Sequence, residues 1–285
     1  MAINWFPGHM HKARKEIKKV MPKMDLIIEV LDARIPFSSE NPLVHALRDN
    51  TPCIKLLNKA DLADPVVTDE WLSYLERERG VKAVAITQYK PAQIRALLKL
   101  FRQFSGVKVS PSRSLQAMIL GIPNVGKSTL INILAGRIIA KTGNTPAVTK
   151  IQQRIKLPEQ VVLYDTPGFL WPRLEPEACG YRLAATGAIR DSVLELEDIA
   201  HFAIEYLMQA YPQELASRFE LEGQLESALE VMDAISMRRG SLRRGGLGDL
   251  HKVAAIVLTE LRGGMIGRVS LERPQMIDDQ TAELT

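Results

Sequence analysis

The chain has 285 residues, of which 46% are hydrophobic and 25% are charged, and its formal net charge is +4. This composition is ordinary for a soluble globular protein of one large or two modest domains, with ample apolar material for a core. The two cysteines, Cys53 and Cys179, lack metal-ligand spacing and indicate no disulfide framework, so we expect a reducing cytoplasmic setting.

In chain order, the first part alternates between apolar runs and segments with helical periodicity. Strands are predicted at 25–33, 53–58, 81–87 and 114–121, and a hairpin of two further strands at 150–157 and 160–164. Helices are predicted at 11–23, 42–49, 91–104 and 127–135. Thr68 is expected to cap another helix that ends near Gly80. This alternation predicts an α/β fold, a mostly parallel sheet with helices on both faces.

The character of the sequence changes after about residue 175. No convincing strand pattern follows, and helical periodicity is found at 195–211, 213–235 and 249–262. We therefore predict an α/β domain over residues 1–175 and an all-helical domain over residues 176–285.

Basic residues gather near both ends of the chain. Residues 12–23 contain six Lys or Arg and one acid, residues 238–273 contain eight and three, and residues 195–233 between them are acidic. This distribution suggests a polyanionic partner, although a charge run is more often a solvated face. No apolar run reaches membrane-spanning length, and no apolar stretch follows the basic N-terminus, so neither a membrane span nor a secretory signal is expected.

The sequence Gly121-Ile-Pro-Asn-Val-Gly126-Lys127-Ser128 matches the phosphate-binding P-loop pattern. It follows a predicted strand and opens a predicted helix, which is the context that makes the pattern specific. Glycines let backbone N–H groups close around phosphate oxygens, and the helix N-terminus adds partial positive charge. Lys127 would reach the β- and γ-phosphates, and the Ser128 hydroxyl would bind Mg²⁺.

A second motif, Asp165-Thr-Pro-Gly168, follows an apolar strand after the P-loop. Asp165 would hold the metal through water, and the Gly168 N–H would sense the γ-phosphate. The polar loop 141–150 between the motifs has the length of a switch segment. Thr149 is the best candidate there to bind Mg²⁺ and γ-phosphate, with Thr142 and Thr145 as open alternatives.

Guanine recognition is expected before the P-loop rather than after it. A GTPase should carry NKxD after DxxG, yet no asparagine occurs beyond Asn144, whereas Asn58-Lys59-Ala-Asp61 ends a predicted strand. Asp61 would accept hydrogen bonds from guanine N1–H and N2–H₂, and adenine lacks the N2 donors, so this carboxylate discriminates between the bases. Asn58 would bind the base edge and nearby backbone, and the stem of Lys59 would cover the base face.

A second base-contacting loop is expected at Thr87 and Gln88, with a plain strand–helix loop as an equal alternative. Joining the termini of an ordinary GTPase and cutting the chain after DxxG reproduces this motif order. The sheet and pocket survive such a permutation because the elements pack identically. The second switch then leads directly into the helical domain, so we hypothesise that its movement is passed to that domain.

The motif order NKAD (58–61), GIPNVGKST (121–129), PAVT (146–149) and DTPG (165–168) resembles that of the circularly permuted GTPases. Four further segments narrow the resemblance, namely WFPGHMHKARKEI (5–17), DARIPFSSENP (32–42), RRGSLRRGGLGDLHKVA (238–254) and LRGGMIGRVSLE (261–272). Together they are similar to the bacterial ribosome biogenesis GTPase A, or YlqF-type, family. Two positions depart from the family pattern, Ala147 where it usually has glycine and Thr87-Gln88 in place of a serine-containing turn.

The resemblance implies a circularly permuted P-loop GTPase domain that binds GTP and GDP and hydrolyses GTP. It also implies a role in late assembly of the large ribosomal subunit, with a helical domain that binds ribosomal RNA of the subunit precursor. We expect a monomer. The nucleotide-binding candidates are Asn58, Lys59, Asp61, Thr87, Gln88, Asn124, Val125, Gly126, Lys127, Ser128, Thr129 and Gly168.

Many GTPases place a water-orienting glutamine directly after DxxG, but here that residue is Phe169. Asn124 resembles the asparagine that lets some GTPases bind K⁺ beside the β- and γ-phosphates. His9 is the other candidate, since the Pro7-Gly8 turn could present its imidazole to the γ-phosphate, although a surface histidine is an equal alternative. The catalytic candidates are therefore His9, Lys127 and Thr149, and we expect slow hydrolysis alone and stimulation by a large partner.

Three other functions are weighed against this hypothesis. NKAD argues against a P-loop ATPase or small-molecule kinase. A GTP-gated RNA-binding scaffold with little hydrolysis is kept open by Phe169. A tRNA-modification GTPase shares the asparagine-bearing phosphate loop but would not show the permuted motif order.

Overall fold

A six-stranded sheet with the order β3-β2-β1-β4-β6-β5 forms the centre of the first part of the chain. The computed structural model describes residues 15–140, 153–171, 174–223, 225–241 and 248–277. The strands are β1 (Leu26–Asp32), β2 (Cys53–Asn58), β3 (Val81–Ala85), β4 (Leu115–Gly121), β5 (Gln153–Leu157) and β6 (Val161–Asp165). All neighbouring pairs are parallel except β5 with β6, which is antiparallel. The predicted α/β fold class is thereby confirmed.

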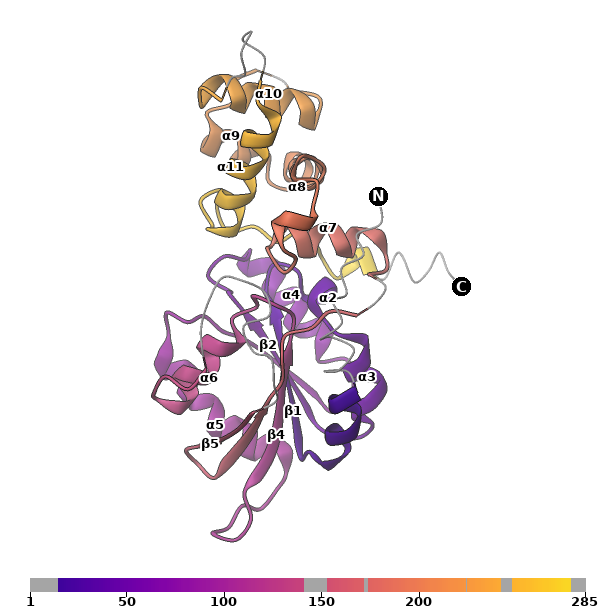
Figure 1. Cartoon of the computed structure of the whole chain (residues 1–285), viewed down its shortest axis with the longest axis vertical. Coiled ribbons are helices and arrows are strands. Elements are labelled where there is room, and N and C mark those ends of the chain that lie inside the picture. The colour runs from indigo at the N-terminus through magenta and orange to yellow at the C-terminus, as the bar shows by residue number, and fades with distance from the viewer. Residues whose placement is uncertain (1–14, 141–152, 172–173, 224, 242–247, 278–285) are drawn as a thin grey trace.

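The strands in the middle of the sheet are covered by helices. Every residue of β1 and β2 is buried, as expected for parallel strands that helices cover on both faces. Helices α5 (Pro91–Ser105) and α6 (Lys127–Ala135) pack together on one side, and α3 (Pro42–Arg48) lies on the other (Figure 1). The short helix α2 (Pro36–Ser39) and α4 (Pro65–Leu75) complete the layer around the sheet.

The second part of the described chain is helical and stands beyond one end of the sheet (Figure 1). It contains α7 (Glu177–Ala185), α8 (Leu196–Ala210), α9 (Pro212–Phe219), α10 (Ala228–Arg238) and α11 (Leu250–Arg262). Two 3₁₀ turns, η1 (Met21–Lys23) and η2 (Asp191–Val193), are also described, and residues 15–20 before η1 are helical, within the predicted helix 11–23. The apolar core runs continuously from the sheet through α7 into α8 and α11, so the two parts share buried contacts.

Two predictions about helices were wrong. Thr68 does not cap α4; the cap is Asp64, whose carboxylate accepts from Val66 N at 2.9 Å and which is followed by a proline in the first turn. Thr68 instead lies inside the helix, where its hydroxyl donates to the Asp64 carbonyl. The predicted helix 213–235 is two helices, because α9 ends at a left-handed Glu220 and α10 begins after the N-cap Ser227.

The described residues after α11 leave the helical part of the chain. After α11 the chain returns to the sheet, where Val269 N donates to Leu62 O at 3.1 Å and Leu271 N donates to Arg34 O at 2.8 Å. Ile277 joins a small apolar cluster against α4 that contains the fully buried Trp71. The boundary at residue 175 stays a prediction, and residues 264–277 contact both parts of the chain.

Candidate functional site

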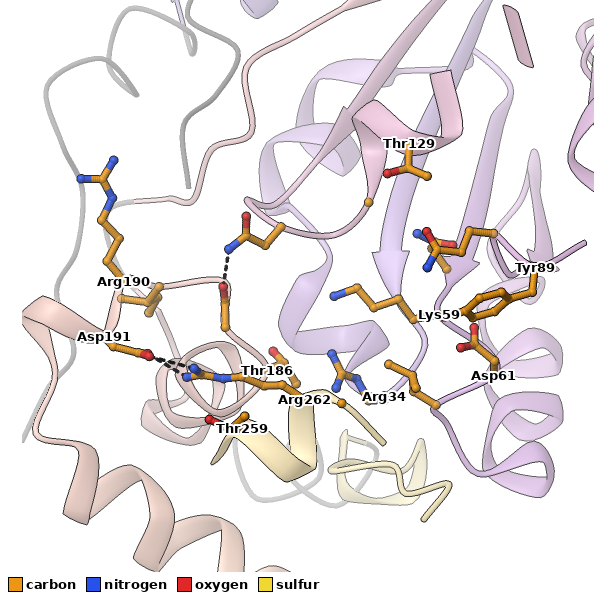
Figure 2. Close-up of a pocket in the computed structure, with 18 of the residues that line it drawn as sticks. Arg34, Lys59, Asp61, Tyr89, Thr129, Thr186, Arg190, Asp191, Thr259 and Arg262 are labelled. Atoms are coloured by element: carbon orange, nitrogen blue, oxygen red, sulfur yellow. Dashed lines mark hydrogen bonds and ion pairs between the residues drawn. The ribbon is translucent and has the colours of Figure 1, made fainter. Parts of the chain in front are cut away.

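A cavity of about 840 Å³ lies at the carboxyl ends of the parallel strands, between the sheet and the helical part. This is the edge of an open α/β sheet where ligands characteristically bind. Figure 2 shows Lys59, Asp61 and Tyr89 on one side of the cavity, with Arg190, Asp191 and Arg262 on the opposite side. Segments that are far apart in the sequence therefore form one site.

The phosphate loop connects β4 directly to α6, as the motif predicts. Gly126 adopts a left-handed φ of 94° immediately before the first residue of the helix, and Asn124 has a φ of 57°. At Gly121 an added Cβ would meet the Val30 carbonyl oxygen at 2.8 Å, so a side chain would not fit. Among the predicted ligands of this loop, Asn124, Gly126 and Thr129 line the cavity.

Lys127 and Asp165 form a buried ion pair at the floor of the phosphate loop. Lys127 Nζ donates to Asp165 Oδ1, and the other carboxylate oxygen, Oδ2, is buried with no hydrogen-bond partner among the described residues. An acceptor left in this way fits a metal-bound water, which would supply the missing donor. Gly168 lies close to the same loop, since an added Cβ there would come within 3.2 Å of Pro123.

The predicted guanine loop meets the phosphate loop through one hydrogen bond. Asn58, the last residue of β2, donates from Nδ2 to the Val125 carbonyl at 2.7 Å. Asn58, Lys59 and Asp61 all line the cavity. The two motifs are separated by more than sixty positions in the sequence, and the structure places them side by side.

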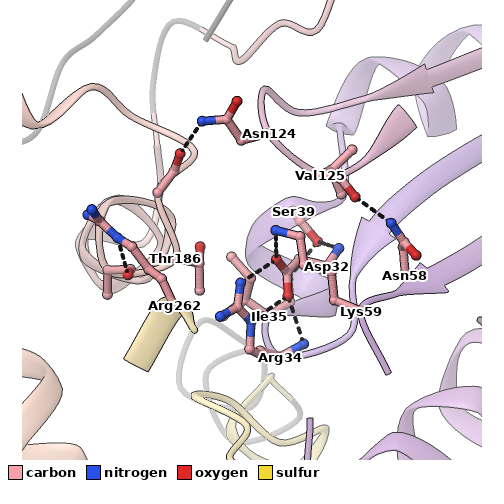
Figure 3. A network of polar contacts seen from close by, with 12 residues as sticks. Asp32, Arg34, Ile35, Ser39, Asn58, Lys59, Asn124, Val125, Thr186 and Arg262 are labelled. Atoms are coloured by element: carbon pink, nitrogen blue, oxygen red, sulfur yellow. Dashed lines mark hydrogen bonds and ion pairs between the residues drawn. The ribbon is translucent and has the colours of Figure 1, made fainter. Parts of the chain in front are cut away.

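A buried ionic network holds Lys59 at the edge of the cavity (Figure 3). Arg34 forms a bidentate pair with Asp32, at 2.9 Å from Nε and 2.8 Å from the terminal nitrogen, and Lys59 Nζ donates to the same carboxylate at 2.9 Å. Burial raises the pKa of Asp32, but the guanidinium and ammonium groups outweigh it and hold that pKa well below its usual range. Asp32 is therefore ionised, and it fixes the direction of the Lys59 side chain.

The loop after β3 contains Thr87 and Gln88, whose contact with the base stays a prediction. Gln88 lines the cavity, whereas Thr87 is buried beneath it, where its hydroxyl oxygen accepts from Tyr89 N at 3.3 Å. Tyr89 also lines the cavity and is 73% exposed, and no sequence motif indicated it.

The helical part supplies the opposite wall, which no sequence motif indicated. Asn124 Nδ2 donates to the Gly187 carbonyl at 2.8 Å, so the phosphate loop contacts the turn after α7. Arg262, at the end of α11, forms a bidentate pair with Asp191 at 2.8 and 2.9 Å. These residues close the cavity opposite the base-recognition loop.

Two of the predicted catalytic residues, His9 and Thr149, lie outside the described residues, as do Thr142, Thr145 and Ala147. Phe169 is described, and it is buried at 1% exposure, so no polar side chain follows DxxG. In the described ranges, no cluster of three His, Cys, Asp or Glu residues could hold a metal ion, and no helix has the length and apolar character of a membrane span.

Comparison with known proteins identifies close relatives over nearly the full chain. Residues 116–230 match a family model described as "50S ribosome-binding GTPase". A ribosome biogenesis GTPase A from Priestia megaterium is 45% identical, with 96% of this chain and 98% of the relative covered. The protein of the same name from Thermotoga maritima is 32% identical, with 99% of each chain covered.

The fold is similar to solved structures as well. The chain matches a GDP-bound structure of YlqF with a TM-score of 0.67 and 28% identity, over 91% of this chain and 99% of that one. It matches GNP-bound YlqF from T. maritima with a TM-score of 0.64 and 28% identity, over 92% and 98% of the two chains.

Proposed function

Because the chain belongs to the ribosome biogenesis GTPase A family, we propose that it hydrolyses GTP during late assembly of the large ribosomal subunit. The observation that carries the proposal is the convergence of NKxD and the phosphate loop on one cavity. Asn58 joins them through its 2.7 Å hydrogen bond to the Val125 carbonyl. A P-loop alone would not determine which nucleotide base is bound, whereas the adjacent Asp61 selects guanine.

Guanine is placed at the Asp61 end of the cavity. The Asp61 carboxylate accepts from the base N1–H and N2–H₂, and the stem of Lys59, held by Asp32, covers the base face. Gln88 and Tyr89 complete this end, and Tyr89 offers an aromatic surface. Thr87 acts beneath the loop by accepting from Tyr89 N, in place of the direct base contact expected from the sequence.

The phosphates occupy the other end, at the N-terminus of α6. Backbone N–H groups of Asn124, Val125 and Gly126, with those of Lys127 to Thr129, face the β- and γ-phosphates in this proposal. Mg²⁺ would be held by Ser128, Thr149 and, through water, Asp165, whose unpartnered oxygen is available for that water. The ion would neutralise charge on the phosphates, and the Gly168 N–H would face the γ-phosphate.

Hydrolysis requires a water-orienting group that Phe169 cannot supply. We assign that role to His9, assisted by K⁺ beside Asn124. We further propose that the protein alone hydrolyses GTP slowly and that a large partner stimulates it. His9→Ala should preserve GTP binding and reduce the stimulated turnover by about 10²-fold, since general acid–base groups contribute on that order. Steady-state hydrolysis with and without large-subunit particles measures this, and unchanged stimulated turnover would remove His9 from the mechanism.

The helical part is the proposed RNA-binding region. The family model's description as a 50S ribosome-binding GTPase supports the large subunit as the partner. Arg238 on α10 and Lys252 on α11 are exposed members of the basic stretch 238–273. Such groups would bind phosphates of ribosomal RNA with a strong dependence on salt. We propose that the chain acts in the cytoplasm as a monomer.

Copurification tests this function. The tagged protein should retain large-subunit precursors with a non-hydrolysable GTP analogue and release them with GDP. Retention that is equal in both states would favour a scaffold without a nucleotide switch, and retention of tRNA in place of subunit precursors would favour the tRNA-modification alternative.

A further inference from the structure

The guanine loop is covered from behind by the chain that follows α11. Arg268 donates from Nε to the Ala63 carbonyl and from a terminal nitrogen to the Ala60 carbonyl, both at 3.0 Å. The next residue, Val269, donates its backbone N–H to the Leu62 carbonyl at 3.1 Å. Three carbonyls within or directly after the NKAD motif are thus satisfied by residues more than 200 positions away.

The covering segment has its own anchors on the sheet domain. Trp71 Nε1 donates to the Glu272 carbonyl at 3.2 Å, and the Glu272 carboxylate accepts from Ser38 N at 3.0 Å. Glu272 is fully buried beside Arg182 of α7, at 3.5 Å. These contacts hold the segment in place independently of Arg268, whose side chain is exposed.

A second line of contacts reaches the same loop from the end of α11. The Leu261 carbonyl accepts from a terminal nitrogen of Arg34 at 3.4 Å, and Arg34 holds Asp32, which holds Lys59. Lys59 has a left-handed φ of 61°, a conformation that its own side chain does not favour. The loop's conformation therefore depends on contacts from outside it.

We propose that Arg268 is a positioning residue for guanine selectivity. It holds the Ala60 and Ala63 carbonyls on both sides of Asp61, and so fixes the turn that directs the Asp61 carboxylate to the guanine N2 amino group. This rests on the proposed function, because it assigns guanine to the Asp61 end of the cavity. Docking of the segment after α11 then sets the selectivity for the base.

The test compares GDP with IDP, which lacks only the N2 amino group that Asp61 accepts from. In wild type, GDP should bind more tightly than IDP and much more tightly than ADP. Arg268→Ala should weaken GDP about tenfold and IDP about twofold, so their affinity ratio falls about fivefold, as expected for misplacing one charged acceptor. The measurement is displacement of a fluorescent GDP analogue from the full-length protein in Mg²⁺.

Arg273→Ala is the matched control, since Arg273 lies on the same segment and faces Asp64 and Glu70 at 4.0 Å without contacting the loop carbonyls. It should leave the GDP to IDP ratio unchanged. An unchanged ratio in Arg268→Ala, or equal weakening of all nucleotides, would overturn the proposal. If Arg268→Ala does not fold, the ratio of GDP affinity to IDP affinity is measured in Arg268→Gln instead. A wild-type protein that does not prefer GDP to ADP would instead contradict the proposed function, whatever Arg268 does.

Discussion

The two ends of the proposed nucleotide cavity, the phosphate end at α6 and the guanine end at Asp61, are built in different ways. The phosphate end is local, because a single strand–loop–helix unit from β4 to α6 places Gly126, Lys127 and Thr129. The guanine end is assembled from distant segments, with Asp32 and Arg34 on one side and the chain after α11 on the other. The phosphate end therefore depends mainly on backbone geometry, whereas the guanine end depends on long-range docking.

This difference separates affinity from selectivity. Substitutions in the phosphate loop should weaken all nucleotides together, because every nucleoside diphosphate offers the same phosphates. Substitutions around the guanine loop should change the ratio between bases. The Asn58 to Val125 hydrogen bond is the point at which one end acts on the other.

The largest effect is expected from Asp61→Asn. An asparagine amide donates to the C2 carbonyl of xanthine and cannot accept from both guanine donors, so preference should change from GDP to XDP. The change in the ratio should be about 10⁴-fold, the range for sites whose buried polar groups are left unpaired. Competition between GDP and XDP measures it, and a variant that keeps its preference for GDP would place the base elsewhere.

Next in size is Lys127→Ala, which removes a buried cation from the phosphate end. GTP affinity should fall by about 10²-fold, comparable to the loss of one preorganised donor. Unlike Asp61→Asn, which changes the preference between bases, Lys127→Ala should leave the ratio of GDP affinity to IDP affinity unchanged. Displacement titrations with both nucleotides measure this, and a fall in the ratio would show that the two ends are not separable.

Arg34→Met tests the support of the guanine loop. It leaves the fully buried Asp32 with Lys59 as its remaining cation, so the free energy of unfolding should fall by about 2 kcal/mol. Arg102→Met is the matched control, because its pair with Glu159 is 38% exposed on both sides and should contribute below about 1 kcal/mol. Urea unfolding compares them, and equal losses would contradict a special role for the buried pair.

The remaining effect is on stability alone and concerns Glu29 in β1, the strand that pairs with both β2 and β4. Burial and the neighbouring Glu40 raise its pKa from 4.5 to about 8, although Lys55 opposes this and Glu78 adds to it. The folded protein therefore keeps a proton that the unfolded chain releases, so the free energy of unfolding falls as pH rises from about 4.5 to about 8.

Glu29→Gln removes this group, so across that window the free energy of unfolding of the wild type should fall more steeply than that of the variant, by up to about 1.4 kcal/mol per pH unit. Thermal unfolding at several pH values provides the comparison, with GDP affinity as the control that should not differ. Parallel pH profiles of the two proteins would mean that Glu29 ionises normally in the fold.

The sequence was sufficient where chemistry is local. Apolar runs predicted every described strand. The motifs predicted that Asn58 and Asp61 lie at one edge of the sheet, and both line the cavity because strand ends of a parallel sheet meet there. It failed where position depends on tertiary contacts. Nothing in the residues around Arg268 indicates that it caps a loop 205 positions away. The sequence also did not predict the break between α9 and α10, because amphipathic periodicity continues across Glu220.

In the proposed function, a guanine nucleotide binds between a base-recognition loop that comes first in the chain and a phosphate loop that comes second. Displacement of a fluorescent GDP analogue by unlabelled GDP and ADP, in Mg²⁺, tests it most directly. GDP should bind at least about 10³-fold more tightly than ADP, because Asp61 rejects a base without the N1 and N2 donors. Equal displacement by the two nucleotides would contradict it.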